Sequence, residues 1–326
     1  MRFGSLFAGA GGFDLGFEAA GLTCAFQVEI DKTANEVLAN RWPDVPKFTD
    51  VREVGSSNLP GCDVLVGGFP CQDLSVAGKR GGLEGGTRSG LFYELARIAC
   101  ELRPRFVVWE NVPGLLSSDN GRDFARVLRH LGDCGFHGGW RVLDARFFGV
   151  AQRRRRVFGV FARGRSGAES CAEILALREG VRGHSAAGGK AGEGVAGRLA
   201  QCLRASGVGT ERAGDGTPLT TYAIQERAVS ENLDNGPGGK GYQPDIAYTL
   251  EARHHVQASA SAFGVRRLTP RECERLQGWP DDHTRYRADG SEIADGPRYR
   301  MIGNGVASPC AHWLARRLLQ YGVFRD

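Results

Sequence analysis

Buried strands and amphipathic helices alternate along the first half of the chain. The run "RFGSLFAG" and the valine-rich runs "CDVLVGG" and "RFVVWE" are apolar enough to predict buried strands. After the first run, Phe13, Gly16, Phe17 and Ala20 share one helical face, and Gly21 stands where a glycine commonly ends a helix. Strands that alternate with helices in this way predict a parallel sheet with helices on both faces.

The alternation continues to about residue 163. The stretch "RSGLFYELARIACELRP" places Leu91, Leu95, Ile98 and Leu102 on one helical face, and Pro104 ends the predicted helix. "GRDFARVLRHLGDCG" repeats the helical spacing, and "WRVLDA" and "RVFGVFA" predict two further strands. The pattern therefore predicts the α/β fold class.

The texture of the sequence changes near Arg163. From there to about Ala262, Gly, Ser and Ala are frequent and helical spacing is weak, so "HSAAGGKAGEGVAG" and "NLDNGPGGKGY" are predicted to be loops or linkers. Helical spacing returns in "LTPRECERLQG" and in "VASPCAHWLARRLL". We expect a large α/β domain of residues 1–164, a smaller loop-rich part of residues 165–297, and a C-terminal segment, residues 298–326, that returns to the large domain.

Composition narrows the class of protein. The chain has 326 residues, 41% of them hydrophobic and 24% charged, which predicts one large domain and one smaller domain. A net charge of +5 permits a nucleic-acid partner without requiring one. No apolar run is long enough to cross a membrane, and the first residues lack a cleavable signal pattern, so we expect a cytoplasmic protein.

The nine cysteines are odd in number, widely spaced and without a C-x-x-C pair. That pattern argues against a disulfide framework or a zinc site and favours a reducing compartment. Eight of them are predicted to be small buried hydrophobic residues: Cys24, Cys62, Cys100, Cys134, Cys171, Cys202, Cys273 and Cys310.

A candidate cofactor site lies at the first strand-to-helix turn, "FAGAGG" (Phe7 to Gly12). Glycines there let the backbone approach a ligand, and a helix N-terminus favours electron-rich groups. Glu29 ends the second strand, where a ribose hydroxyl is usually held, and Asp50 could bind the amine edge of an adenine. Taken singly, such a turn is weak evidence for a cofactor, and lone carboxylates are more often solvated surface groups. The glycine spacing departs from G-x-G-x-x-G, which disfavours a nicotinamide cofactor.

A candidate nucleophile, Cys71, lies in "GGFPCQ" after the strand "CDVLV". The carboxyl ends of parallel strands form the ligand-binding edge of an open α/β sheet, and the preceding proline fixes the local backbone. Glu110, in "ENV" at the end of "RFVVWE", would reach the same edge. A carboxyl group there could hydrogen-bond a pyrimidine ring nitrogen and act as a general acid.

An arginine run, "QRRRRVF", follows. If it forms a strand, Gln152, Arg154 and Arg156 share one face. The alternative is a solvated basic patch or a processing signal. Beside Cys71, such arginines would hold phosphate and pyrimidine.

Taken together in sequence order, these motifs resemble the cytosine-5 DNA methyltransferases. They are "FAGAGGF", "EID", "GGFPCQ", "GLFYELARI", "ENV", "QRRRR", "RRLTPRECERLQGWP" and "IGNGVASP", and they cover roughly residues 1–163 and 265–320. The pair "PCQ" and "ENV" separates this family from amino-group methyltransferases, which act without a cysteine nucleophile. The resemblance implies a Rossmann-like, class I S-adenosylmethionine-dependent methyltransferase sheet, with the smaller loop-rich part as the target-recognition domain.

The resemblance also implies the reaction. Carbon 5 of cytosine is buried in duplex DNA, so the base must be flipped out. Cys71 would attack carbon 6, Glu110 would bind and protonate ring nitrogen 3, and Arg154 would help to hold the pyrimidine. S-adenosylmethionine would supply the methyl group. The base that removes the proton at carbon 5 is not identified by the sequence, and water can serve.

Three sets of residues are assigned by the resemblance. The catalytic set is Cys71, Glu110, Asn111, Gln152, Arg154 and Arg156. The residues expected to line the S-adenosylmethionine pocket are Phe7, Ala10, Gly11, Gly12, Glu29, Ile30, Asp50, Val51, Pro70, Leu91, Asn304 and Val306. Alanine at position 10 stands where many relatives have a larger aliphatic residue, which predicts a thinner cofactor contact there. The glycine-rich segment "LSVAGKRGGLEGGTRSG" is typical of a mobile loop that closes over DNA, with the candidate DNA contacts Ser75, Lys79, Arg80 and Arg88.

Residues 266–280 resemble the packing block of the family. We expect Arg267, Glu272 and Arg275 to form a structural ion-pair network and Trp279 to be a core residue. The recognised DNA sequence is not readable, because residues 164–265 match no motif. Candidate phosphate or base contacts there are Arg198, Arg204, Arg212, Arg227, Arg253, His254 and His255.

Other functions remain open. The nearest is an RNA (tRNA) cytosine-5 methyltransferase on the same fold, although the long segment before residue 266 favours major-groove reading of duplex DNA. A non-catalytic DNA-binding homologue would not need Cys71, Glu110 and the arginines, and a nicotinamide oxidoreductase leaves "PCQ" and "ENV" unexplained. We expect a monomer that acts on DNA in a bacterial or phage-infected cell, where restriction–modification, phage and orphan regulatory roles are indistinguishable from the sequence.

Overall fold

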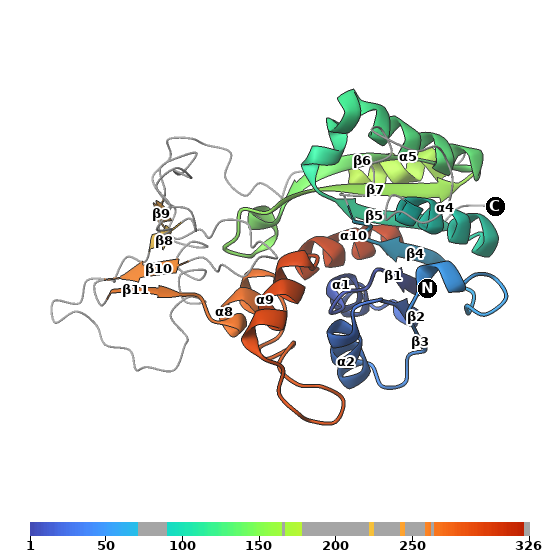
Figure 1. Ribbon diagram of the computed structural model, residues 1–326. Helices are drawn as coiled ribbons and strands as arrows, with labels where there is room; N and C mark the ends of the chain where they lie inside the picture. The colour runs from blue at the N-terminus through green and yellow to red at the C-terminus, as the bar shows by residue number, and fades with distance from the viewer. Residues whose placement is uncertain are drawn as a thin grey trace.

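In the computed structural model, the described residues are 1–70, 90–164, 167–177, 222–224, 242–244, 258–261 and 264–322. Seven strands form one sheet in the order β3-β2-β1-β4-β5-β7-β6 (Figure 1). The strands are β1 (Arg2–Leu6), β2 (Thr23–Val28), β3 (Lys47–Phe48), β4 (Val64–Gly67), β5 (Phe106–Asn111), β6 (Phe136–Asp144) and β7 (Arg155–Arg163).

The sheet is mixed rather than wholly parallel. β1 to β5 pair in parallel, whereas β7 runs antiparallel between β5 and β6. The prediction of a parallel sheet is therefore wrong for β6 and β7. The connection from β6 to β7 contains only a short 3₁₀ turn, η6 (Ala145–Phe148), and a parallel crossover needs a dozen or more residues. The two strands must therefore form an antiparallel pair.

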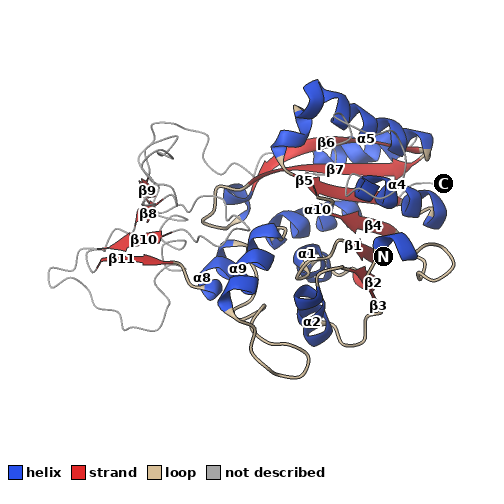
Figure 2. Ribbon diagram, viewed as in Figure 1, coloured by secondary structure: helices blue, strands red, loops and turns tan. Residues whose placement is uncertain are grey.

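Helices cover both faces of the sheet (Figure 2). They are α1 (Gly12–Ala19), α2 (Lys32–Arg41), α4 (Leu91–Leu102), α5 (Arg122–Asp133), α6 (Gly167–Leu175), α8 (Pro270–Leu276), α9 (Asp295–Asn304) and α10 (Ser308–Tyr321). Within β4, Val64 and Val66 belong to the core cluster that contains Leu314 of α10, and Leu65 to the cluster that contains Leu95 of α4. The strand is thus buried on both faces, as its unbroken apolar run predicts.

Three helices are not predicted by the sequence pattern: α2, α6 and α9. The helix α6 corrects the expectation that helical spacing is weak directly after residue 163, because Cys171, Ile174 and Leu175 form its buried face. The helix α9 is not predicted because its sequence, "DGPRYRMIGN", contains glycines and a proline, which disfavour helices.

The last helix, α10, packs against α1 at close range. A side chain added at Gly16 would lie 2.6 Å from the Cβ of Ala311 and from the backbone oxygen of Ser308. Only glycine therefore lets these two helices approach, and the C-terminal helix completes the core beside β1. A second sheet of four antiparallel strands has the order β11-β10-β8-β9 and lies beyond α8 and α9 in Figure 1. Its strands are β8 (Tyr222–Ile224), β9 (Tyr242–Pro244), β10 (Ala258–Ser261) and β11 (Gly264–Arg267). The domain boundaries given above remain a prediction.

A search of the described residues finds no helix with the length and apolar character that a membrane span requires.

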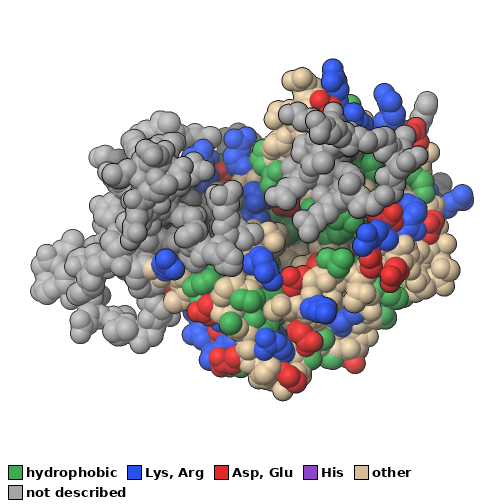
Figure 3. Space-filling model, viewed as in Figure 1, with side chains coloured by type: hydrophobic (Ala, Val, Ile, Leu, Met, Phe, Trp, Pro, Cys, Tyr) green, Lys and Arg blue, Asp and Glu red, His purple; other side chains and the backbone are tan. Residues whose placement is uncertain are grey.

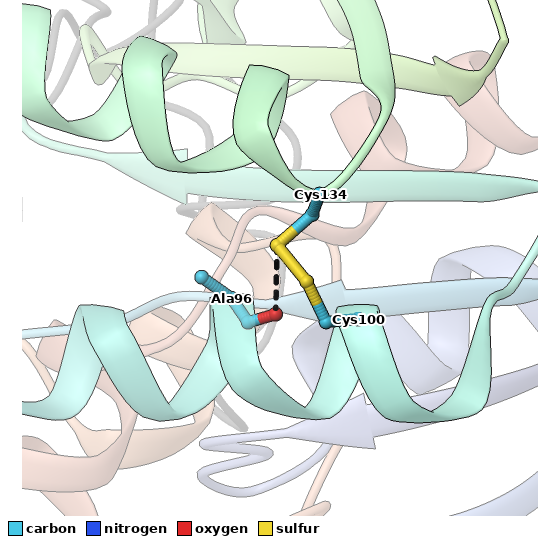
Figure 4. The surroundings of a disulfide bond; sticks show 3 residues. All are labelled: Ala96, Cys100 and Cys134. Atoms are coloured by element: carbon cyan, nitrogen blue, oxygen red, sulfur yellow. Dashed lines mark hydrogen bonds between the residues drawn. A yellow bond between two sulfur atoms is a disulfide. The ribbon is translucent and has the colours of Figure 1, made fainter.

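Two cysteines differ from their predicted state. Cys100 and Cys134 form a disulfide that joins the end of α4 to the C-cap of α5, with a Cα–Cα distance of 5.3 Å (Figure 4). The expectation that both are unpaired buried hydrophobic residues is wrong, because their spatial pairing across 34 residues leaves no mark in the sequence. Cys24, Cys171, Cys273 and Cys310 are free and buried, Cys62 is free and half-buried, and Cys202 lies outside the described residues.

Two measurements test this cross-link. The denatured, unreduced chain is expected to have seven thiols that react with a thiol reagent, the nine cysteines less the two in the disulfide, and nine thiols after reduction. Cys134→Ser should lower the free energy of unfolding by about 2–4 kcal/mol, since the bond restricts the unfolded chain. Cys62→Ser is the matched control. Nine reactive thiols before reduction would contradict the pairing.

Candidate active site

The glycine-rich turn follows β1 and holds a strained backbone. Phe7, Gly9 and Gly11 have φ angles of 53°, 55° and 86°, in the left-handed region. Gly9 donates its N–H to Glu29 Oε2 at 2.8 Å, and Asp31 donates its N–H to Glu29 Oε1 at 2.7 Å. Burial raises the pKa of Glu29, although these N–H groups oppose the shift. The carboxylate at the end of β2 therefore fixes the turn that precedes α1.

The turn is pressed between distant parts of the chain. A side chain at Gly11 would lie 2.4 Å from the ring of Trp42, and one at Gly12 would lie 2.5 Å from the backbone oxygen of Val306. Glycine at 11 and 12 is thus required by close packing, not only by conformation. Ala10 is fully buried, so its small side chain belongs to the core beneath the turn.

The groups around this turn suit a nucleoside ligand. Ile30 is 67% exposed directly after Glu29, an unusual place for a large aliphatic side chain. Asp50 accepts hydrogen bonds from the backbone N–H and the guanidinium of Arg52, which hold its pKa below the ordinary value, and Val51 is buried. A side chain at Gly9 would meet no described residue within 4 Å, so within the described part of the chain open space lies beside the turn.

The remaining predicted pocket residues come from three other segments. Pro70, after β4, is exposed, and Leu91 is half-buried at the start of α4. Asn304 ends α9 with an exposed side chain, and Val306 is buried beside the turn.

Glu110, the last residue but one of β5, is a buried carboxyl group. Its Oε1 lies 3.0 Å from Nε of Arg156, and the two side chains are only 10% and 15% exposed. Burial raises the pKa of Glu110, while Arg156 and Arg154 oppose the rise. A side chain at Gly68 would lie 3.4 Å from Glu110 Oε2, so Glu110 lies against the segment that leads into Cys71.

Asn111 connects the same two strand ends. Its Nδ2 donates to the backbone oxygen of Phe69 at 2.9 Å, and its Oδ1 accepts from the N–H of Val112 at 2.8 Å. The residue is 3% exposed. Asn111 therefore positions the backbone just before Cys71.

The arginine run is not one continuous strand. The N–H of Arg154 donates to the oxygen of Gln152 at 3.1 Å, and β7 begins only at Arg155. The predicted shared face of Gln152, Arg154 and Arg156 is therefore wrong in its geometry. Gln152 is fully buried, and neither of its amide atoms has a hydrogen-bond partner among the described residues.

Arg154 and Arg156 have different surroundings. Arg154 is 2% exposed and donates from Nη2 to the oxygens of Gly303 and Gly305, at 3.1 and 2.9 Å. Burial and the neighbouring Arg156 lower the pKa of Arg154 to about 9. Arg154 thus joins the start of β7 to the end of α9, and Arg156, not Arg154, forms the close ion pair with Glu110.

Several predicted residues lie outside the described residues. They are Cys71, Ser75, Lys79, Arg80 and Arg88, and further Arg198, Arg204, Arg212, Arg227, Arg253, His254 and His255.

The packing block begins with a capped helix. Thr269 and Glu272 form a capping box at the start of α8, and Arg275 pairs with Asp281 at 2.5 Å. Arg267 is exposed. Trp279 is 3% exposed and donates to the oxygen of Val306 at 3.0 Å, which confirms its predicted place in the core.

Two residues near the turn are missed by the sequence reasoning. Trp42 packs on Gly11, and His283 lies 2.6 Å from the oxygen of Ala10. A tryptophan directly after α2 could have been predicted to pack in the core near the turn. No pattern in the sequence indicates that His283 lies next to Ala10.

Charges of both signs are intermixed on the described surface. On the face shown in Figure 3, Lys and Arg side chains lie among Asp and Glu side chains over the lower part, which carries α2 and α9. Arg300, for example, pairs with Asp31 at 3.1 Å. Within the described residues, no group of His, Cys, Asp and Glu has an arrangement that could hold a metal ion.

The chain is similar to known methyltransferases. The profile of the family described as C-5 cytosine-specific DNA methylase matches residues 1–175 and 205–320. The Type II methyltransferase M1.ScrFI of Lactococcus lactis subsp. cremoris is 32% identical over 328 residues, which cover 97% of this chain and 77% of that protein. A DNA N-6-adenine-methyltransferase of Escherichia phage P1 is 30% identical, over 98% of this chain but 61% of the phage protein. The solved structure of the S. pombe Dnmt2 methyltransferase has a TM-score of 0.63 at 17% identity, covers 99% of both chains and supports the fold.

Arg154 is buried and its neighbour Arg155 is exposed, so the same substitution should change stability differently at the two positions. Arg154→Lys should lower the free energy of unfolding by about 1–3 kcal/mol, because a lysine cannot reproduce the guanidinium contacts and leaves a buried carbonyl unpaired. The exposed neighbour Arg155, changed to Lys, should alter it by less than about 0.5 kcal/mol. Urea unfolding measures both, and equal midpoints for the two variants would contradict the assignment of Arg154.

Proposed function

This chain belongs to the family of C-5 cytosine-specific DNA methylases and is a DNA cytosine-5 methyltransferase, and from that premise we propose how its residues act. The proposal is that a methyl group passes from S-adenosylmethionine to carbon 5 of a cytosine flipped out of duplex DNA, while Cys71 is bonded to carbon 6. The single observation that carries it is the buried Glu110, paired with Arg156 and lying against the segment before Cys71.

S-adenosylmethionine is proposed because the residues fit it. Glu29 would accept the ribose hydroxyls, the exposed Ile30 would cover one face of the adenine, and Asp50 would meet its amine edge. The turn from Phe7 to Gly12, with Val306 behind it, would hold the rest. Bound there, S-adenosylmethionine supplies an electrophilic methyl group.

The proposed S-adenosylmethionine pocket also includes the other residues that the family resemblance assigns to it. They are Ala10, Gly11, Val51, Pro70, Leu91 and Asn304.

Glu110 and Arg156 would prepare the cytosine ring. A carboxyl group with a raised pKa keeps its proton at higher pH and can donate it to ring nitrogen 3, which makes carbon 6 more electrophilic. Arg156 would orient that carboxyl group through their ion pair and could donate to a pyrimidine oxygen. Asn111 fixes the backbone before the nucleophile, and Arg154 supports the site through its contacts to Gly303 and Gly305.

DNA recognition is assigned to residues 165–297, with Ser75, Lys79, Arg80 and Arg88 as contacts beside the nucleophile. Because its relative in Lactococcus is named a Type II methyltransferase, the proposal includes a role in a restriction–modification system. Bisulfite sequencing of DNA from an expressing host tests the whole assignment. Protected cytosines in one sequence context support it. Conversion of every cytosine would contradict it, as would methyl transfer to tRNA but not to duplex DNA when the purified protein is given each substrate.

Cys71→Ala should abolish methyl transfer and leave the affinity for S-adenosylhomocysteine within about twofold of wild type, because the proposed role of the thiol is to attack the base and not to bind the cofactor. Cys62→Ala is the matched control and should retain activity. Transfer by Cys71→Ala at a near wild-type rate in a single-turnover assay would remove Cys71 from its role.

Glu110→Gln should slow single turnover by about 10²–10⁴-fold. In the wild type, the rate should fall as pH rises through the raised pKa of Glu110, because the proton donor is then lost. The glutamine variant should lack this alkaline decline. The free energy of unfolding should depend on pH in the same direction. The stabilisation from protonated Glu110 is present below the ordinary carboxyl pKa and is lost as pH rises through the raised pKa. Identical pH profiles for both proteins would exclude Glu110 as the acid.

A further inference from the structure

The imidazole of His283 lies directly beneath the glycine-rich turn. The residue is fully buried, and its Nε2 lies 2.6 Å from the backbone oxygen of Ala10. A carbonyl only accepts hydrogen bonds, so Nε2 must donate. Burial lowers the pKa of His283 to about 4, and the neutral ring therefore has one N–H, which is committed to Ala10. Nothing in the methyl-transfer chemistry above uses this contact.

Three aromatic rings support three consecutive residues of the turn. His283 makes edge contacts with Trp42 and Trp279, at centroid distances of 5.9 and 5.3 Å. Trp42 also lies against Gly11, and a side chain at Gly12 would lie 3.2 Å from the ring of Trp279. Of the three contacts to the turn, only that of His283 is a hydrogen bond to its backbone. Packing restrains position, whereas this bond also fixes the orientation of a peptide group.

The segment that carries the imidazole is itself held under strain. Asp282 has a φ of 58°, which is rare for a residue other than glycine and persists only where the surroundings enforce it. Its carboxylate pairs with Arg271, and Arg41 of α2 donates to the backbone oxygens of Asp282 and His283, the latter at 3.0 Å. The arginines thus maintain the conformation that aims the imidazole at Ala10.

We propose that His283 is a positioning residue for the cofactor, which holds the peptide group after Ala10 in the orientation that S-adenosylmethionine binds. The inference rests on the proposed function. The N–H of that peptide group, at Gly11, donates to the oxygen of Ala8 at 2.9 Å, and His283 holds its carbonyl end. Holding both ends before binding removes an entropic cost from the binding step. The residue acts through the turn and does not touch the reacting atoms.

Isothermal titration of the full chain with S-adenosylhomocysteine tests this role. His283→Phe keeps an aromatic ring but removes the donor, and it should weaken binding by about 5–20-fold. His283→Gln places an amide N–H near the same point and should restore affinity to within about threefold of wild type. In kinetics, His283→Phe should raise the KM for S-adenosylmethionine, with kcat unchanged at saturating cofactor. A purely structural role would not be rescued by glutamine.

Arg41→Gln tests the same device without altering the aromatic cluster. Arg41 is exposed, and its loss should weaken S-adenosylhomocysteine binding by about threefold or more, because the segment at 282–283 is released. Arg287→Gln is the matched control, since Arg287 donates to Ser291 and Glu292 elsewhere in that loop. Wild-type affinity in both His283→Phe and Arg41→Gln contradicts the inference alone. No binding by the wild-type chain contradicts the proposed function, and the inference with it.

Discussion

The close approach of Gly12 to the backbone of Val306 is the contact on which the site depends. It joins the first turn of the chain to a segment almost three hundred residues later, and no side chain fits between them. Because Trp279 donates to the same carbonyl of Val306, the packing block, the C-terminal segment and the glycine turn share one point of contact. In the same turn, a side chain at Gly9 would meet no described residue within 4 Å, and Ile30, next to Glu29, is exposed.

Burial determines the properties of Glu110, the carboxyl group that we propose as the acid. Glu110 is the last residue but one of β5, a central strand whose residues are all buried. The same desolvation that raises its pKa makes its pairing with Arg156 necessary. Asn111, the next residue, uses its amide to secure the backbone at Phe69. Adjacent residues of one strand thus provide the carboxyl group that we propose as the acid and the contact that holds the backbone before the proposed nucleophile.

The sequence predicts the parts of the fold that follow from local pattern. The apolar runs of β4 and β5, the amphipathic α4 and the turn at Phe7–Gly12 all lie where the pattern places them. What depends on spatial pairing is not predictable in this way. The tight turn from Gln152 to Arg154 changes which arginine meets Glu110, the short β6–β7 connection reverses a strand, and Cys100 meets Cys134 across two helices. His283 lies beside Ala10 in a segment where Asp282 has a φ of 58°, and no local pattern in the sequence indicates either feature.

The central claim is that Cys71 forms a bond with carbon 6 of the target cytosine. Duplex DNA synthesised with 5-fluorocytosine tests it most directly. Fluorine replaces the proton at carbon 5 that a base would remove, so the cysteine is not released and the protein–DNA bond persists. With S-adenosylmethionine present, mass spectrometry of the digested complex should find the nucleotide attached to the peptide that contains Cys71. A stable bond between the DNA and a peptide without Cys71 would contradict the account. So would the absence of any bonded complex when 5-fluorocytosine stands at the position that the protein methylates.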